Sequence, residues 1–268
     1  MEEVKIAKTE VEPRNNTSTT QPKKIKGKFL PTRVSKFDDL IEIRGLERGS
    51  TILISGGAGT GKTTFCLQSI YNGAMKGEKG IYISLEEEPT KIKAHMLRNF
   101  GWDFDKLEKE KKVAIIKFDP MEIARSVEAT IMGSKEELVI DFKEFSLPFK
   151  PDRIVIDSLS ALAIVFGSTE KYRIYLKHLF EKLEENDSIN FILSETDQNP
   201  MRYAKSGVEE FLADGVIVLY NIQIKNKRQN ALEILKLRSS KHEKKIIPYE
   251  ISDNGFDIHP DQDIFSEE

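Results

Sequence analysis

Short apolar runs alternate along the chain with longer stretches whose apolar positions recur every three or four residues. The runs are rich in β-branched residues and predict strands at residues 51–55, 80–85, 113–118, 153–157 and 190–194. The stretches between them predict helices after residue 61, from residue 89 and over residues 170–185. Because strands that alternate with helices build mostly parallel sheets covered on both faces, we expect an α/β fold with a twisted parallel sheet.

The pattern changes after residue 215. Residues 215–224 and 231–239 are strand-like runs on either side of the polar segment KNKRQN, which predicts an antiparallel hairpin, and residues 246–252 predict a strand beside it. These strands would add an antiparallel edge to the sheet. We expect one domain over residues 29–258. Residues 1–28, rich in Lys, Glu, Thr, Asn and Pro, predict a disordered N-terminal tail, and residues 259–268 a C-terminal tail.

A glycine-rich segment, GGAGTGKTT, follows the first predicted strand and precedes a helical pattern. The spacing Gly56-x-x-x-x-Gly61-Lys62-Thr63 is that of a phosphate-binding P-loop. Glycines let the backbone wrap closely around an anion, so that N–H groups and the helix N-terminus face it. Lys62 would reach the β- and γ-phosphates of a nucleoside triphosphate, and the Thr63 hydroxyl would bind Mg²⁺. The predicted nucleotide-binding residues are Gly57, Ala58, Gly59, Thr60, Gly61, Lys62, Thr63 and Thr64.

Acidic residues follow two other predicted strands. Asp157 ends the run RIVID, and an acid at the tip of a strand near a P-loop can hold Mg²⁺ through water. Glu86, Glu87 and Glu88 follow the strand at residues 80–85, where one of them could polarise an attacking water. The alternative for these glutamates is a solvated acidic turn, stabilised by the dipole of the next helix.

Composition narrows the class of protein. The chain has 41 Lys and Arg against 44 Asp and Glu, a net charge of −3 that argues against a protein that coats DNA but leaves room for a local basic patch. The single cysteine, Cys66, excludes an intramolecular disulfide and fits a reducing cytoplasm. No apolar run approaches the roughly 20 residues of a membrane helix, and the N-terminus lacks the apolar segment of a secretion signal. We therefore expect a cytoplasmic protein with no membrane partner.

Taken together, the segments resemble the RecA/KaiC-like P-loop ATPases, and in particular single-domain archaeal KaiC-like proteins. The resemblance covers about residues 30–258 and rests on an ordered set: GGAGTGKTTFCLQSIYNGAMKGEKGIYISLEEEP, FGWDFDKL, RIVIDSLSAL, SGVEEFLADGVIVLYN, LEILKLRSSKH and PYEISDNGFDI. It implies a RecA-like core with ATP and Mg²⁺ as cofactors. It also implies a homo-oligomer, a hexameric ring with ATP between subunits, that works in regulation or signalling with a protein partner the sequence does not identify.

The resemblance also implies roles for single residues. It makes Glu86 the general base, with Glu87 beside it. It brings the segment KLRSSKH to the nucleotide of a neighbouring subunit, so that Lys236 and Arg238 act in trans on the γ-phosphate and His242 lies near it. Without the resemblance, this segment would be a basic edge strand of solvated charges. Residues 121–150 depart from the family pattern, and the sequence does not predict their structure.

Two other functions remain open at this stage. The first is a paralogue of the RecA/RadA recombinases that binds single-stranded DNA in recombination or repair. The loop after residue 194 supports it, because Arg202, Tyr203 and Lys205 combine an aromatic ring with two cations that can stack a base and neutralise phosphates. Glu195 weighs against it, because recombinases usually place a glutamine or asparagine there. The second is a module that binds ATP without appreciable turnover.

Overall fold

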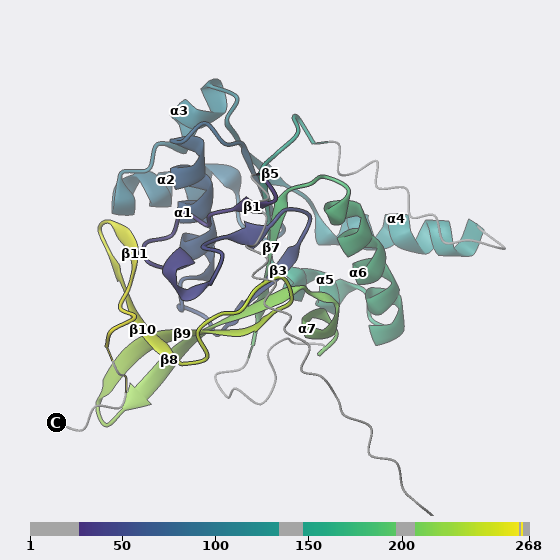
Figure 1. Cartoon of the computed structure of the whole chain (residues 1–268). Helices are drawn as coiled ribbons and strands as arrows, with labels where there is room; N and C mark the ends of the chain where they lie inside the picture. Colours follow the sequence, from purple (N-terminus) through teal and green to yellow (C-terminus); the bar gives the residue numbers. More distant parts are fainter. Residues whose placement is uncertain (1–26, 134–146, 197–206, 263, 265–268) are drawn as a thin grey trace, which may run out of the picture.

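The computed structural model describes residues 27–133, 147–196, 207–262 and 264. Its parallel strands are β3 (Thr51–Gly56), β4 (Gly80–Ser84), β5 (Val113–Lys117), β6 (Arg153–Asp157), β7 (Ile189–Glu195) and β8 (Gly215–Ile224). The antiparallel strands are β9 (Lys227–Leu237), β10 (Ile247–Ser252) and β11 (Gly255–Ile258). Together they form one nine-stranded sheet in the order β11-β10-β9-β8-β3-β7-β6-β4-β5 (Figure 1). The predicted α/β fold, with its antiparallel C-terminal edge, is confirmed.

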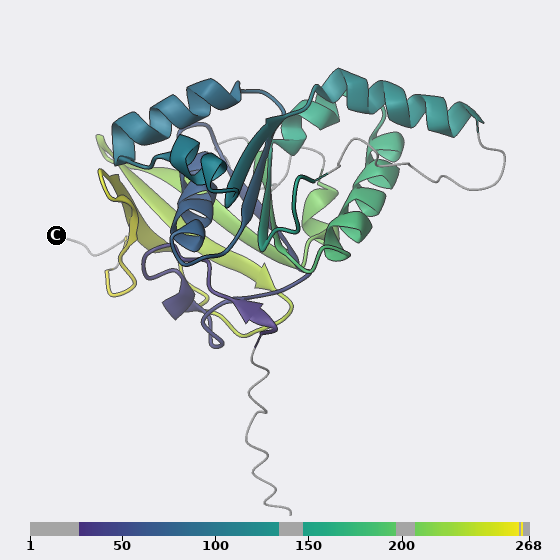
Figure 2. The same ribbon diagram turned by 90° about the horizontal axis from the view of Figure 1, so that it is seen from above.

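Helices cover both faces of the sheet (Figure 2). One face carries α1 (Lys62–Ala74), α2 (Pro89–Phe100) and α3 (Phe104–Lys109), together with the short helix η1 (Asp38–Leu40) and the strand pair β1 (Phe29–Leu30) and β2 (Leu46–Glu47). The other face carries α4 (Pro120–Gly133), α5 (Leu159–Val165), α6 (Thr169–Glu184) and α7 (Glu209–Leu212). None of the helices in the described ranges has the length and apolar character needed to span a bilayer.

Side chains that alternate along the strands pack into a core on each face of the sheet. In β4, Tyr82 packs in the core under α1, whereas Ile81 and Ile83 pack in the core under α5 and α6. All six residues of β3 are buried, as expected for a central parallel strand covered on both faces. Every strand that the apolar runs predicted is present. The central run of β3 is buried from both sides, whereas β5 at the edge of the sheet alternates between buried and partly exposed positions.

Local signals explain where the helices begin and end. Pro89 occupies the first turn of α2, where its missing N–H group costs no helical hydrogen bond. Gly101 ends α2 in the left-handed region, with φ of 68°. The hydroxyl of Ser168 accepts a hydrogen bond from the N–H of Lys171 and so caps the start of α6.

The structure differs from the expected hairpin at residues 225–230. Strand β9 already begins at Lys227, so Lys225 and Asn226 alone form the turn. Asn221 and Asn230 face each other across the hairpin, and their side chains are hydrogen bonded at 2.9 Å. Apolar alternation missed this part of β9 because the tip of the hairpin buries neither face and carries polar residues instead.

Several other elements were not predicted, among them α3, α4, α5, α7 and β11. Helix α5 has only seven residues, too few for a helical period to stand out from its apolar composition. Within the unplaced segment 121–150, residues up to 133 belong to α4 and residues 134–146 lie outside the described residues. Of the predicted tails, residues 1–26, 263 and 265–268 also lie outside them.

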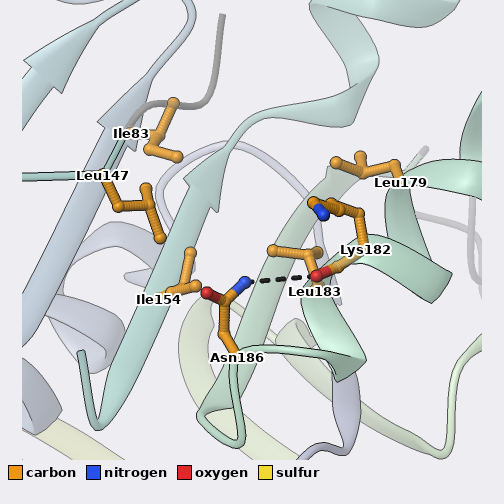
Figure 3. A pocket seen from close by; sticks show the side chains of 7 residues that line it. All are labelled: Ile83, Leu147, Ile154, Leu179, Lys182, Leu183 and Asn186. Carbon is orange, nitrogen blue, oxygen red and sulfur yellow. Dashed lines mark hydrogen bonds between the residues drawn. The ribbon is translucent and has the colours of Figure 1, made fainter. Parts of the chain in front are cut away.

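A cavity of about 180 Å³ lies between α6 and the sheet (Figure 3). It is lined by Ile83, Leu147, Ile154, Leu179, Lys182, Leu183 and Asn186. Asn186 donates a hydrogen bond to the carbonyl of Lys182 at one end of the cavity. The lining is mostly apolar and includes none of the residues predicted to bind phosphate or metal.

Candidate functional site

The predicted P-loop lies where β3 meets α1, at the carboxyl end of the parallel strands. Gly59 and Gly61 have φ of 79° and 84°, in the left-handed region that favours glycine. Among the described residues, a Cβ atom at Gly59 would meet nothing within 4 Å, so they leave the loop open on that side. A Cβ atom at Gly61 would lie 2.4 Å from Cδ1 of Ile251, so the loop is tightly packed on the other. The loop therefore offers one open face to a ligand.

The ammonium of Lys62 lies inside this loop. Its Nζ donates to the carbonyls of Gly56 at 2.8 Å and Gly57 at 3.0 Å, and the residue is 8% exposed. Burial lowers the pKa of Lys62, whereas the carboxylates of Glu195 and Asp157 raise it. Lys62 thus places a positive charge at the start of α1, close to acidic groups. A polyanion bound in the loop would contact this charge.

Thr63 and Asp157, the two predicted metal ligands, lie next to each other. The Thr63 hydroxyl donates to Oδ2 of Asp157 at 2.7 Å. The hydroxyl of Tyr82 donates to the same oxygen. Burial raises the pKa of Asp157, and the hydrogen bonds from Tyr82 and Thr63 oppose that rise. Sequence reasoning missed Tyr82, because a tyrosine in a buried strand has the pattern of an ordinary core residue.

The three glutamates after β4 point to different partners. Glu86 Oε1 accepts a hydrogen bond from the Ser158 hydroxyl at 2.9 Å, next to the aspartate that ends β6. The carboxylate of Glu87 is 3.4 Å from the ammonium of Lys91 on α2. Glu88 pairs with a lysine at the end of β5. Of the three, Glu86 therefore lies beside the strand that carries the predicted metal ligand.

Lys236 and Arg238 lie near the amino ends of the parallel strands, whereas the P-loop lies at their carboxyl ends. The N–H of Arg238 donates to the carbonyl of Asp214 at 2.9 Å, and the N–H of Asp214 donates to the carbonyl of Thr51 at 2.8 Å, where β3 begins. From there β3 runs five residues to Gly56, about 16 Å at the usual rise of a strand. This distance exceeds the length of an arginine side chain, so the pair lies out of reach of the P-loop in its own chain.

Both of these cations bind the end of α7. Lys236 Nζ donates to the carbonyls of Glu210 at 3.0 Å and Ala213 at 2.6 Å. Arg238 donates to the carbonyl of Phe211 at 3.1 Å. Burial lowers the pKa of Lys236, and the charge of Arg238 lowers it further. Within one chain, the two side chains satisfy carbonyls that the helix end leaves without partners.

The remaining candidates are placed less centrally. Glu195 ends β7 directly opposite Gly56. His242 forms a bridge with Ile41, and its two ring nitrogens are buried with no hydrogen-bond partner among the described residues. The loop residues of the DNA-binding hypothesis, Arg202, Tyr203 and Lys205, lie outside the described residues.

The P-loop has a brace that the sequence did not reveal. The hydroxyl of Tyr249 in β10 donates to the carbonyl of Thr60 at 2.5 Å. Phe256 in β11 and Ile251 pack against the position of Gly61. The two hydrogen-bonded residues are 189 positions apart, and no motif links them. The C-terminal strands therefore hold the phosphate loop from behind.

These residues fit a Mg²⁺–nucleotide. The first N–H groups of α1 lack partners within the helix, and the loop is open above Gly59. The hydroxyl of Thr63 and the carboxylate of Asp157 supply the hard oxygen ligands that Mg²⁺ prefers. Within the described ranges, no group of three or more His, Cys, Asp or Glu residues forms a metal cluster.

Comparison with known proteins places the chain in a family. The family model described as "ATPase: KaiC" matches residues 30–263. The circadian clock oscillator protein KaiC of Synechococcus elongatus is 33% identical over 233 residues, which cover 86% of this chain and 44% of that protein. The chain belongs to the KaiC family of ATPases. The RecA/KaiC-like P-loop ATPase that the motifs indicated is thereby confirmed.

Other members of the KaiC family support the same placement. The KaiC protein of a Nostoc species is 31% identical over 260 residues, 95% of this chain and 48% of that protein. The chain thus spans about half the length of these curated relatives. The crystal structure of a KaiC-like protein from Pyrococcus horikoshii matches with a TM-score of 0.71 and 34% identity, covering 87% of this chain and 99% of that one. The sheet and helices described above are therefore a KaiC-like RecA fold.

Proposed function

We propose that this KaiC-family chain is a Mg²⁺-dependent ATPase that acts as a homo-oligomer in regulation or signalling. ATP would bind at the contact between subunits of a hexameric ring in the cytoplasm, and a further protein would receive the signal. We assign the ATPase domain to residues 29–258, flanked by tails at residues 1–28 and 259–268. Membership of the KaiC family supports the ATPase itself.

One observation carries the proposal. The hydroxyl of Thr63, in the first turn of α1, donates a hydrogen bond of 2.7 Å to the carboxylate of Asp157 at the end of β6. Both residues lie beside Lys62 of the P-loop. Thr63 and Asp157 come from segments 94 residues apart, and this pairing of a hydroxyl with a carboxylate is what a Mg²⁺ site on a bound nucleotide requires. An ordinary glycine-rich turn that happened to contain a lysine would not require this pairing of Thr63 with Asp157.

Each residue of the site would have a distinct role in hydrolysis. The P-loop N–H groups and Lys62 would bind the β- and γ-phosphates, and Thr63 with Asp157 would hold Mg²⁺. When bound, Mg²⁺ neutralises charge on the phosphate oxygens. Glu86, oriented by its hydrogen bond from Ser158, would accept a proton from the attacking water. Glu87 is the weaker candidate, because its carboxylate faces Lys91.

The sheet's geometry supports a role in trans for Lys236 and Arg238. The pair lies near the amino end of β3, at the opposite end of this strand from its own P-loop. A phosphate that the pair contacts would therefore belong to a neighbouring subunit. Binding there would require both side chains to leave the carbonyls of α7. His242 would lie near the same nucleotide.

The first experiment measures phosphate release from ATP, with and without Mg²⁺ and with and without single-stranded DNA at low salt. We expect slow, Mg²⁺-dependent release that DNA leaves unchanged. A rise of several-fold with DNA would instead support the recombinase paralogue, which the KaiC matches do not favour. Saturable ATP binding without phosphate release would support the module without turnover.

A further inference from the structure

Tyr82 contacts the site from inside the core. The residue lies in the middle of β4 and is 1% exposed, and its hydroxyl donates to Oδ2 of Asp157. Val155 in β6 pairs with Tyr82, and Asp157, two residues further along β6, projects from the same face. The phenol ring therefore runs along this face of the sheet, and its hydroxyl reaches the carboxyl edge where α1 begins.

Two hydroxyl donors thus converge on one oxygen of the aspartate. Thr63 donates to Oδ2 at 2.7 Å, and Tyr82 donates to that same atom. Within the described residues Oδ1 accepts no hydrogen bond, so this oxygen remains available to a cation or its water shell. The ring of a phenylalanine would fill nearly the same core volume as Tyr82, so packing alone does not explain the hydroxyl.

We propose that Tyr82 is a positioning residue for the metal: its hydroxyl fixes the carboxylate of Asp157 so that the second oxygen stays available to Mg²⁺. This inference rests on the proposed function, because it requires a Mg²⁺–nucleotide at the P-loop. Mg²⁺ demands near-ideal octahedral geometry, so a carboxylate free to rotate binds it less well. Partners that orient a ligating carboxylate are typically worth 10- to 100-fold in metal affinity.

The test is the Mg²⁺ concentration that half-saturates ADP binding in the variant Tyr82→Phe, measured by calorimetry. We expect an increase of about tenfold, with ADP binding in EDTA unchanged. The matched control is Tyr172→Phe, which also removes a buried hydroxyl from a carboxylate, that of Glu209 at 2.8 Å. A purely structural hydroxyl would change the melting temperature in either variant but leave the Mg²⁺ dependence alone.

The outcomes separate this inference from the proposed function. A Tyr82→Phe protein with the Mg²⁺ dependence of the wild type overturns the inference and leaves the proposed function standing. A wild-type protein whose ADP binding is indifferent to Mg²⁺ overturns both.

A second measurement needs no variant and applies if Tyr82→Phe does not fold. Wild-type protein labelled with ¹³C at the ζ-carbon of tyrosine is observed by NMR with ADP. Mn²⁺, which suits the same oxygen ligands, is expected to broaden one tyrosine signal far more than the others. That signal is expected to shift when Mg²⁺ is added to the ADP complex. A set of tyrosine signals that Mn²⁺ leaves sharp would contradict a hydroxyl beside the metal ligand.

Discussion

The three adjacent glutamates after β4 have different polar partners. The carboxylate of Glu86 is held by Ser158, that of Glu87 faces Lys91 on α2, and that of Glu88 faces β5. Three neighbours of the same residue type thus have three surroundings, because successive positions after a strand project in different directions. The proposed role of Glu86 as general base therefore depends on its own contacts and is tested one residue at a time.

Glu86→Gln tests this assignment directly. The amide keeps the volume of the side chain but accepts protons poorly, so we expect phosphate release to fall by about 100-fold or more. ATP binding should stay within a few-fold of the wild type. Glu88→Gln is the matched control and should leave both unchanged. The assignment fails if Glu87→Gln abolishes release while Glu86→Gln does not.

Residues that belong to local motifs were predictable from the sequence, and residues that join them from elsewhere were not. Lys62 and Thr63 follow from glycine spacing, and Asp157 from its place at the end of a strand. The hydroxyl of Tyr82 and the donor Ser158 have no such signal. Their partners are fixed by strand register and by a turn, which the linear pattern does not encode.

At the scale of elements, Asp152 joins three segments just before β6. Its carboxylate accepts from Arg48 after β2 at 2.7 Å and from the N–H of Lys79 before β4 at 2.8 Å. Burial acts to raise the pKa of Asp152, but these hydrogen bonds outweigh it, and the net pKa lies below the ordinary value of 3.8. Stability from this group is therefore present above pH 3.8 and is lost as the pH falls through the folded-state pKa.

Asp152→Asn is accordingly expected to lower the free energy of unfolding at pH 7. The difference from the wild type should shrink steadily as the pH falls below 4, where the wild-type carboxyl also loses its charge. Urea unfolding at a series of pH values measures both effects. Asp253→Asn, at an exposed position, is the control and should change little at any pH. A difference that grows on acidification would contradict the sign of the pKa shift.

The brace on the P-loop also belongs to the scale of elements. Tyr249→Phe leaves the carbonyl of Thr60 without its donor, and an unsatisfied buried group costs about 1–3 kcal/mol. We expect a lower melting temperature and an ATP affinity reduced several-fold. Tyr220→Phe removes a hydroxyl that donates to Glu233 on the β8–β9 hairpin, and it should affect stability alone. Equal ATP affinity in the two variants would argue that the brace does not shape the loop.

Elements were predicted well where apolar periodicity was strong and poorly where it was short or absent. The buried strands and α6 are long enough to show their period. Helix α5 is too short, and the polar tip of β9 has no buried face. The contact between β10 and the P-loop arises only when the sheet is assembled, so no local pattern reports it.

At the scale of the whole molecule, the distance between Arg238 and its own P-loop leads to a prediction about mixtures of variants. If Arg238 completes a site in trans, Lys62→Ala and Arg238→Ala should each abolish ATP hydrolysis alone. Mixed together, they should regain part of it, because some contacts pair an intact Lys62 with an intact Arg238. Phosphate release across a series of mixing ratios measures this.

The control for mixing is Arg228→Ala, which removes an exposed arginine at the other end of β9. Alone it should hydrolyse ATP like the wild type, and with Lys62→Ala it should show only its own activity, diluted. Absence of rescue by Arg238→Ala at every ratio would argue against a shared site. Analytical ultracentrifugation of each mixture shows whether mixed assemblies have formed.

The hydrogen bond from Tyr249 to the P-loop has a consequence for the order in which the protein is made. The phosphate loop leaves the ribosome 189 residues before the strand that braces it. At roughly 5–20 residues per second, that interval is on the order of ten seconds or more. During this interval the P-loop has been synthesised but lacks its contacts with β10 and β11. A nascent chain should therefore acquire nucleotide binding only after these two strands have been synthesised.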